Sequence, residues 1–203
     1  REEIFAADRL GAAVTRLYER HAELLPEGPE RERAAATARS VEGWNGPIDP
    51  DRLATTMTPS IECVDHRNLG TWSARGAAEV LGHFRLQSQL ATGFAGRTDE
   101  VLALAPDALL VRRTYFGSAR DSGGVFEHVV VELFAFGADG LRARAELWEP
   151  DLDVEALARF DEMTAYGTGA AANWFGNAAA RTDRELFERF NARDWPGIEA
   201  LAA

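Results

Sequence analysis

The chain has 203 residues, 46% of them hydrophobic, enough for one ordinary domain with extensions or for two small domains. Its 33 acidic residues outnumber 22 basic residues, all of them Arg, and the formal net charge is −11. This balance argues against nucleic acid and against an anionic membrane surface as partners, and no apolar run approaches the roughly 20 residues of a membrane span.

The cysteine content and the first residues of the chain give information about the cellular compartment. Cys63 is the single cysteine, so the chain has no internal disulfide framework, and we interpret Cys63 as a small core residue. Together with the missing signal peptide, this favours a cytoplasmic protein. The start at Arg1 instead of Met suggests a fragment of a longer protein.

The first half of the chain is predicted to be mainly helical. Residues 8–24 have helical periodicity, with Leu10, Val14, Leu17 and Tyr18 on the apolar face. Asp49 or Asp51 is a suitable cap for a short third helix. The elements expected next are helices over 30–44 and 51–57, a strand over 60–66 and a helix over 74–86.

The second half changes to a period of two, which is typical of strands. Strands are expected at 99–105, 108–117, 125–136 and 141–149. Their short turns predict an antiparallel meander, and helices packed on one face of it make an α+β fold. The chain is expected to close with a helix over 151–165, a Gly- and Ala-rich linker over 166–180 and a helix over 181–191.

The two ends of the chain suggest an internal repeat. Residues 3–19 align without gaps on residues 146–162, at a constant offset of 143 and with five identities in 17 positions. Residues 190–202 also resemble residues 44–54 after a small shift. The alternative is that unrelated amphipathic helices share common residue types. The repeat predicts the tail of one unit, one full unit and the head of a third.

The order of these motifs resembles that of the ketosteroid isomerase-like family, also called nuclear transport factor 2-like or SnoaL-like. The strand ending CVDHR (63–67), the helix start RGAAEVLGHF (75–84) and the run VVVELFAFGADGLRARAELW (129–148) carry the resemblance, which covers about residues 45–165. It implies a cone-shaped, curved antiparallel sheet packed against N-terminal helices, with extra flanking helices. The implied division is a preceding tail (1–25), the domain (26–165), a linker (166–180) and a following head (181–203).

The resemblance also implies a chemistry of proton transfer next to a carbonyl. Asp65 takes the place of the family's base, Glu132 that of its oxyanion-binding acid and Trp148 that of its pocket Trp. Two carboxyls in one apolar pocket push their pKa values apart, so that one stays ionised while the other is protonated. The sequence departs from this pattern at the family's Tyr on the first helix, because ungapped spacing places Val41 there.

Strand parity extends the candidate site. It places His128 and Glu132 on one face of their strand, and Arg144, Glu146 and Trp148 on one face of the next. We expect an Arg144–carboxylate pair to line the inner end of the cone, which would suit a polar ligand better than a sterol. The remaining ligand-binding candidates are Tyr115 and His66. No metal-ligand spacing is found, and no cofactor is expected.

Three functions remain open on the sequence. The first is a non-catalytic module that binds a small polar ligand or mediates assembly within a larger, actinobacterial-type regulatory or signalling protein. The second is an isomerase, cyclase or hydratase that uses Asp65 as base and Glu132 as acid on a small polar carbonyl compound. The third is an interaction domain that forms a homodimer through its sheet face.

Overall fold

The computed structural model describes residues 3–6, 9–70 and 72–167. Its helices are α1 (Leu10–Leu24), α2 (Pro29–Glu42), α3 (Pro50–Ala54), α4 (Ala77–Leu90) and α5 (Asp153–Gly167). Its strands are β1 (Gly46–Pro47), β2 (Met57–Asp65), β3 (Ala74–Arg75), β4 (Ala91–Ala105), β5 (Ala108–Ala119), β6 (Val125–Phe136) and β7 (Arg142–Trp148). The helix predicted over 181–191 and most of the predicted linker lie outside the described residues.

Local sequence signals set several of these boundaries. The Asp49 side chain accepts hydrogen bonds from the amides of Asp51 and Arg52, which caps α3 as predicted. Gly140 turns the chain between β6 and β7 with a φ of +76°, and a Cβ there would lie 2.3 Å from the carbonyl oxygen of Arg33. Only glycine therefore lets this turn approach α2 so closely.

The seven strands form one curved sheet in the order β1-β4-β5-β6-β7-β2-β3. The β2–β7 pair is parallel, which the meander prediction did not include, and the other pairs described are antiparallel. Strand β4 begins at Ala91, eight residues before the predicted start. Its first half contains Gly93, Gly96 and Thr residues, which hide the alternation that marked the later strands.

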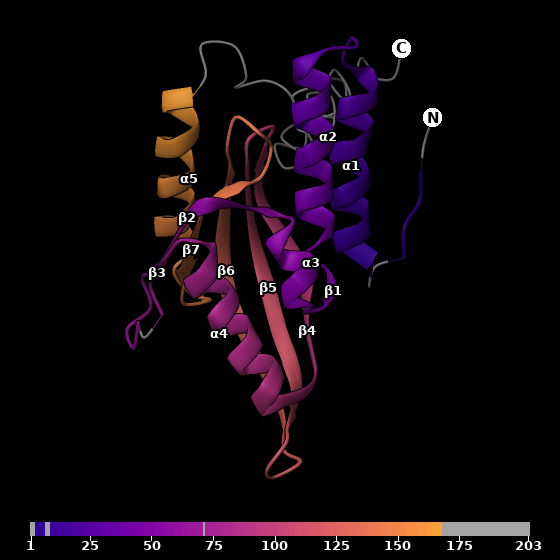
Figure 1. The fold of residues 1–203 in the computed structure, drawn as a ribbon. Coiled ribbons are helices and arrows are strands. Elements are labelled where there is room, and N and C mark those ends of the chain that lie inside the picture. The colour runs from indigo at the N-terminus through magenta and orange to yellow at the C-terminus, as the bar shows by residue number, and fades with distance from the viewer. Residues whose placement is uncertain (1–2, 7–8, 71, 168–203) are drawn as a thin grey trace, which may run out of the picture.

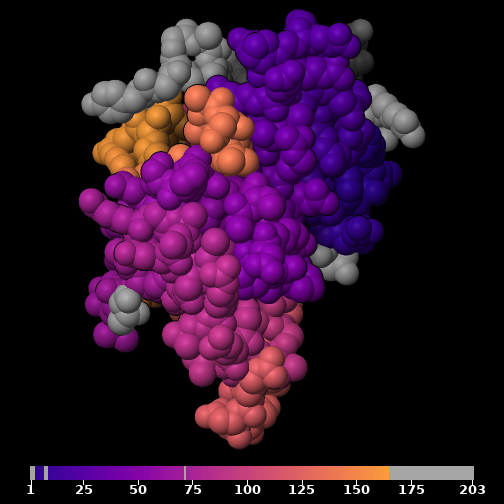
Figure 2. Space-filling view, viewed as in Figure 1, coloured from indigo at the N-terminus to yellow at the C-terminus, as the bar shows by residue number. Residues whose placement is uncertain are grey.

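Helices cover both faces of this sheet. The larger core lies on the concave side, where Leu53 of α3 and Phe84 of α4 pack with Val130 of β6. On the convex side, Phe160 of α5 packs with Val131, the next residue along β6. Figure 1 shows α2, α3 and α4 on one side and α5 on the other, and Figure 2 shows the body narrowing towards the β5–β6 turn. The structure is thus an α+β cone, as expected.

Helix α1 packs on this body next to α2 (Figure 1). Val14 and Tyr18 are buried, and the Tyr18 hydroxyl donates to the carbonyl oxygens of Ala105 and Ala108 at 2.8 and 3.0 Å. Leu17, which the sequence placed on the apolar face, is 41% exposed. Among the described residues, no helix combines the length and apolarity required to cross a bilayer.

Candidate functional site

A cavity of about 310 Å³ lies on the concave side, between α4 and strands β4 to β7. Its walls are mainly aromatic and come from five elements of the fold. Trp72 and Phe84 meet edge to face, with ring centroids 5.7 Å apart. Phe94 of β4 lies nearly parallel to Tyr115 of β5 at 6.0 Å. Such walls favour a flat apolar group, because aromatic rings prefer edge and offset-stacked contacts.

Polar groups gather where the loop after β2 reaches this cavity. Arg67 forms a two-pronged ion pair with Asp65, and both nitrogen–oxygen distances are 2.7 Å. A further nitrogen of Arg67 lies within hydrogen-bond distance of His128 Nε2. Burial and the Arg67 charge together lower the pKa of His128 below its ordinary value. His128 is therefore neutral at pH 7 and can donate to, or accept from, a ligand.

Asp65, the candidate base, is sequestered by this ion pair. Its side chain has 0% exposure, and both of its oxygens accept from Arg67. Burial by itself favours the protonated acid, but the hydrogen bonds and charge of Arg67 outweigh it and hold the pKa of Asp65 below its usual range. A carboxylate in this state is a weak base, since both of its oxygens accept hydrogen bonds from Arg67 and its pKa is lowered.

Glu132, the candidate acid, is buried on the concave side of the sheet. It is 2% exposed and accepts a hydrogen bond of 2.9 Å from the Tyr115 hydroxyl. Arg113 Nε lies 3.6 Å from the same carboxyl. Burial raises the pKa of Glu132 above its ordinary value, although the nearby Arg charges act in the opposite direction. The sequence spacing placed Val41 at the position of the family's Tyr, and Val41 lies in the apolar core. The hydroxyl that donates to this carboxyl comes instead from Tyr115 of β5.

Arg142 completes the charged group beside Glu132. Its guanidinium carbon lies 3.7 Å from the ring centroid of Trp44 and 3.4 Å from that of Phe134. The residue is completely buried, and none of its three guanidinium nitrogens has a hydrogen-bond partner within the described part of the chain. Burial lowers the pKa of Arg142 to about 9, so the side chain remains charged at neutral pH.

Asp65 and Glu132 lie on the same face of the sheet. Each is the register partner of Leu147 on β7, and Leu147 lines the cavity. Because one strand separates them, their backbones are about 10 Å apart. Neither carboxylate lines the cavity, however; its walls contain Arg67, Tyr115 and His128 instead.

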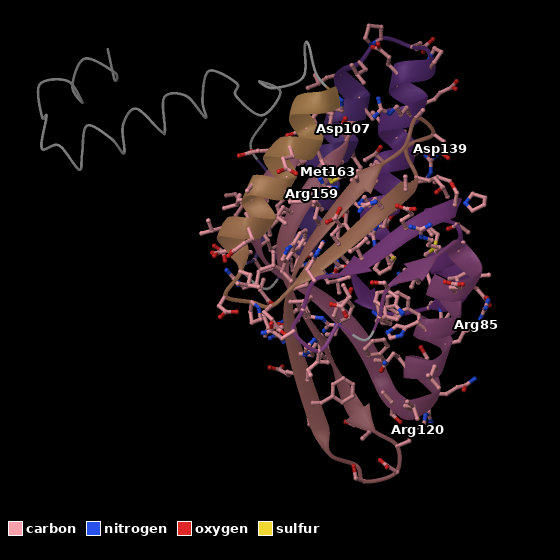
Figure 3. All side chains as sticks on the ribbon, turned by 90° about the vertical axis from the view of Figure 1, so that its left-hand side faces the viewer. Arg85, Asp107, Arg120, Asp139, Arg159 and Met163 are labelled. Atoms are coloured by element: carbon pink, nitrogen blue, oxygen red, sulfur yellow. The ribbon has the colours of Figure 1, made fainter. Side chains whose placement is uncertain are left out.

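Three predicted ligand-binding residues of β7, Arg144, Glu146 and Trp148, lie on the convex face, so their placement in the cone was wrong. Trp148 packs in the convex core and stacks on His66, with ring centroids 4.7 Å apart. Glu146 accepts from His66 at 2.7 Å, from Arg144 and from Arg159 of α5, which Figure 3 labels. The predicted Arg144–Glu146 pair thus exists, but on the side opposite the cavity.

The cause of this error is an irregularity near the start of β7. Phe136 pairs with Arg142 but Ala135 pairs with Arg144, so Ala143 is an extra residue in this strand. A bulge of this kind reverses the side-chain alternation beyond it. Arg142 consequently points into the cone, and Ala145 and Leu147 replace Arg144 and Glu146 on the concave face.

Sequence reasoning also missed Arg67 and Arg113. Arg113 could have been found from β5, because period-two alternation places it on the same face as Tyr115. Arg67 lies two residues after Asp65 in a loop, where no periodicity indicates its direction. Among the described residues, no group of three or more His, Cys, Asp or Glu side chains is arranged to hold a metal ion.

No protein-family model matches the chain, and no curated protein matches its sequence. Similar solved structures include a putative SnoaL-like polyketide cyclase from Jannaschia sp. CCS1, with 15% identity and a TM-score of 0.43 over 76% of this chain and 95% of that one. An NTF2-like protein from Burkholderia thailandensis has 22% identity and a TM-score of 0.44 over 64% and 97%. A hypothetical protein from Catenulispora acidiphila, solved with trimethylamine and described as having a ketosteroid isomerase-like fold, has 15% identity and a TM-score of 0.45 over 56% and 83%.

Proposed function

We propose that the chain is a non-catalytic unit that binds a small molecule in the concave cavity, as part of a larger regulatory protein. The observation that supports this most directly is that both candidate catalytic carboxyls are sequestered while an aromatic cavity remains beside them. Asp65 is paired on both oxygens, and Glu132 is covered by Tyr115. Proton transfer would require one of these carboxyls to reach a substrate.

The cavity walls define the class of ligand. A volume of about 310 Å³ is at the lower end of the range for small-molecule sites. The aromatic walls favour a flat ring system, and Arg67 with His128 offers hydrogen bonds to an oxygen acceptor. We therefore propose a small aromatic carboxylate or ketone as ligand, which is less polar than the small polar ligand expected from the sequence.

The enzymatic alternative retains one favourable observation, since Asp65, Leu147 and Glu132 share a face of the sheet. It would require Arg67 to leave Asp65 when substrate binds. Asp65→Asn removes the base but keeps the size of the side chain. If a compound that binds were also converted by the protein, and Asp65→Asn abolished the conversion, the enzymatic alternative would replace our proposal.

The binding proposal is tested by native mass spectrometry and thermal shift with a panel of aromatic carboxylates and ketones. Val130→Phe fills the cavity from β6, and we expect it to reduce the affinity of any hit at least tenfold. Val129→Phe adds the same volume on the opposite face of the same strand, where Val129 is 36% exposed, and should leave affinity unchanged. Equal binding by both variants, or no binding by the unmodified chain, would contradict the proposal.

A further inference from the structure

Two segments of the chain build the same ion-pair arrangement. Arg159 uses Nε and Nη2 to hold Glu146, each at 3.1 Å from Oε1, and uses Nη1 to hold Glu162 at 3.0 Å. Arg16 uses the same nitrogens for the corresponding glutamates, and its Nη1 also binds Glu23 at 2.9 Å. Its Nε and Nη2 bind Glu3 at 2.8 and 3.1 Å, and its Nη1 binds Glu19 at 3.0 Å.

These residues correspond one to one at a constant offset of 143 in the sequence. The helices that carry them begin at the same offset, because α1 begins at Leu10 and α5 begins at Asp153. The arginine is therefore the seventh residue of each helix. An ion pair between residues three apart on a helix is common. Helical geometry does not require the other pair, in which the glutamate lies 13 residues before the arginine and outside the helix.

The two segments differ in what covers their apolar side chains. At the end of the domain, Leu147, Trp148 and Phe160 are 5%, 5% and 6% exposed, Leu147 on the concave side of the sheet and the other two on the convex side. The residues at the equivalent positions near the start of the chain are Ile4, Phe5 and Leu17, and they are 89%, 38% and 41% exposed. The N-terminal segment thus presents the same apolar positions as the domain's own tail, without a sheet beneath them.

Helix α1 has room for two partners on different faces. Its contacts with the present domain use Val14, Tyr18 and Ala22. The face equivalent to the one that α5 turns towards the sheet contains Ala13 and Leu17, which each precede Val14 or Tyr18 by one residue and so are rotated by about 100° around the helix. In Figure 1, the segment that leads into α1 also runs along the side of the helix away from α2.

We propose that residues 3–24 are the β7–α5 tail of a preceding copy of this same fold, so that α1 is a helix shared by two consecutive units. Phe5 and Leu17 would then pack on the convex side of that unit's sheet, as Trp148 and Phe160 do here, and Ile4 on its concave side, as Leu147 does. One face of the shared helix closes the preceding unit and the other packs on the following unit. Consecutive domains are then joined rigidly, independently of what the cavity binds.

The test lengthens the full chain at its N-terminus. Residues 1–145 are fused directly to residues 3–203, so that Glu3 follows residue 145 in the place of Glu146. We expect a monomer with two folded units, in which the amides of Ile4 and Phe5 at the joint exchange with solvent at least tenfold more slowly than in the original chain. An unfolded first unit, or unchanged exchange at these amides, would overturn the proposal.

Two controls separate the proposal from a simple failure to fold. In the first control, a flexible linker joins residues 1–167 to residues 3–203, so that the first unit keeps its own tail. Folding of this version establishes that the first unit is able to fold in a fusion. In the direct fusion, Leu17→Asp at the joint should unfold the first unit only, while in the original chain it should leave Tm unchanged because Leu17 is exposed. Leu90→Asp, at another exposed leucine, is the matched substitution, and equal effects of the two would contradict the proposed surface.

Discussion

Glu132 on β6 and Glu146 on β7 are equally buried, at 2% and 1% exposure, but lie on opposite faces of the sheet. Burial dominates at Glu132 and raises its pKa. Burial also opposes ionisation of Glu146, but hydrogen bonds from Arg144 and His66 and the charge of Arg159 hold its pKa below the ordinary value. A small exposed area therefore does not by itself set the sign of the pKa shift, which follows the balance between the depth of burial and the hydrogen bonds that the carboxyl accepts.

The arginines differ in the same way. On the convex face, Arg144 and Arg159 are 28% and 35% exposed and point their donors at Glu146. On the concave face, Arg113 and Arg142 are almost completely buried, and Arg142 has aromatic rings in place of hydrogen-bond acceptors. Burying a charge without hydrogen bonds costs several kcal/mol. The concave group is thus the less stable arrangement, and it lies beside the cavity.

The largest effect is expected for Glu132→Ala. The substitution leaves two buried guanidinium groups without a carboxyl and removes the acceptor of the Tyr115 hydroxyl. We expect a loss of about 3–5 kcal/mol in the free energy of unfolding, measured by urea denaturation. Glu146→Ala should cost less, about 1.5–3 kcal/mol, because its arginines can turn to water. Equal losses for the two variants, or a larger loss for Glu146→Ala, would contradict the difference between the two faces of the sheet.

A smaller effect of opposite sign is expected for Arg142→Met. Methionine keeps most of the volume between Trp44 and Phe134 but removes a buried charge that makes no hydrogen bonds to the described residues. Replacing buried charges by apolar side chains is often neutral or stabilising, by about 1–4 kcal/mol. Arg144→Met removes hydrogen bonds to Glu62 and Glu146 and should destabilise instead. A clear loss of stability in Arg142→Met would show that the concave charges hold the fold together.

The smallest expected effect is the pH dependence that Glu132 and Glu146 give to the free energy of unfolding. Because its folded pKa is raised, the contribution of Glu132 is fully present below the ordinary Glu pKa of about 4.3 and is lost as the pH rises through the raised value. The folded pKa of Glu146 is lowered, so its contribution is present above about 4.3 and is lost as the pH falls through the lowered value. Chemical denaturation of Glu132→Gln and Glu146→Gln across pH 3–9 should therefore give stability differences from the unmodified chain that change in opposite directions. Parallel curves would contradict the assignment.

The sequence by itself determined the α+β class, the order of the helices and the later strands, and local details such as the Asp49 cap. It also grouped His128 with Glu132 on one face of their strand, because regular alternation along β6 continues without interruption where it pairs with β5. These features depend on backbone propensity and on periodicity over a few residues, which are properties of a short segment.

Only the tertiary structure decided the face to which each β7 side chain points and the partner of Asp65. The bulge at Ala143 arises from the register in which β7 pairs with β6. The parallel pairing of β2 with β7 joins segments some 80 residues apart. A single inserted residue moves Arg144, Glu146 and Trp148 to the other side of the sheet. Such choices are made by contacts between distant strands, so no local pattern in the chain specifies them.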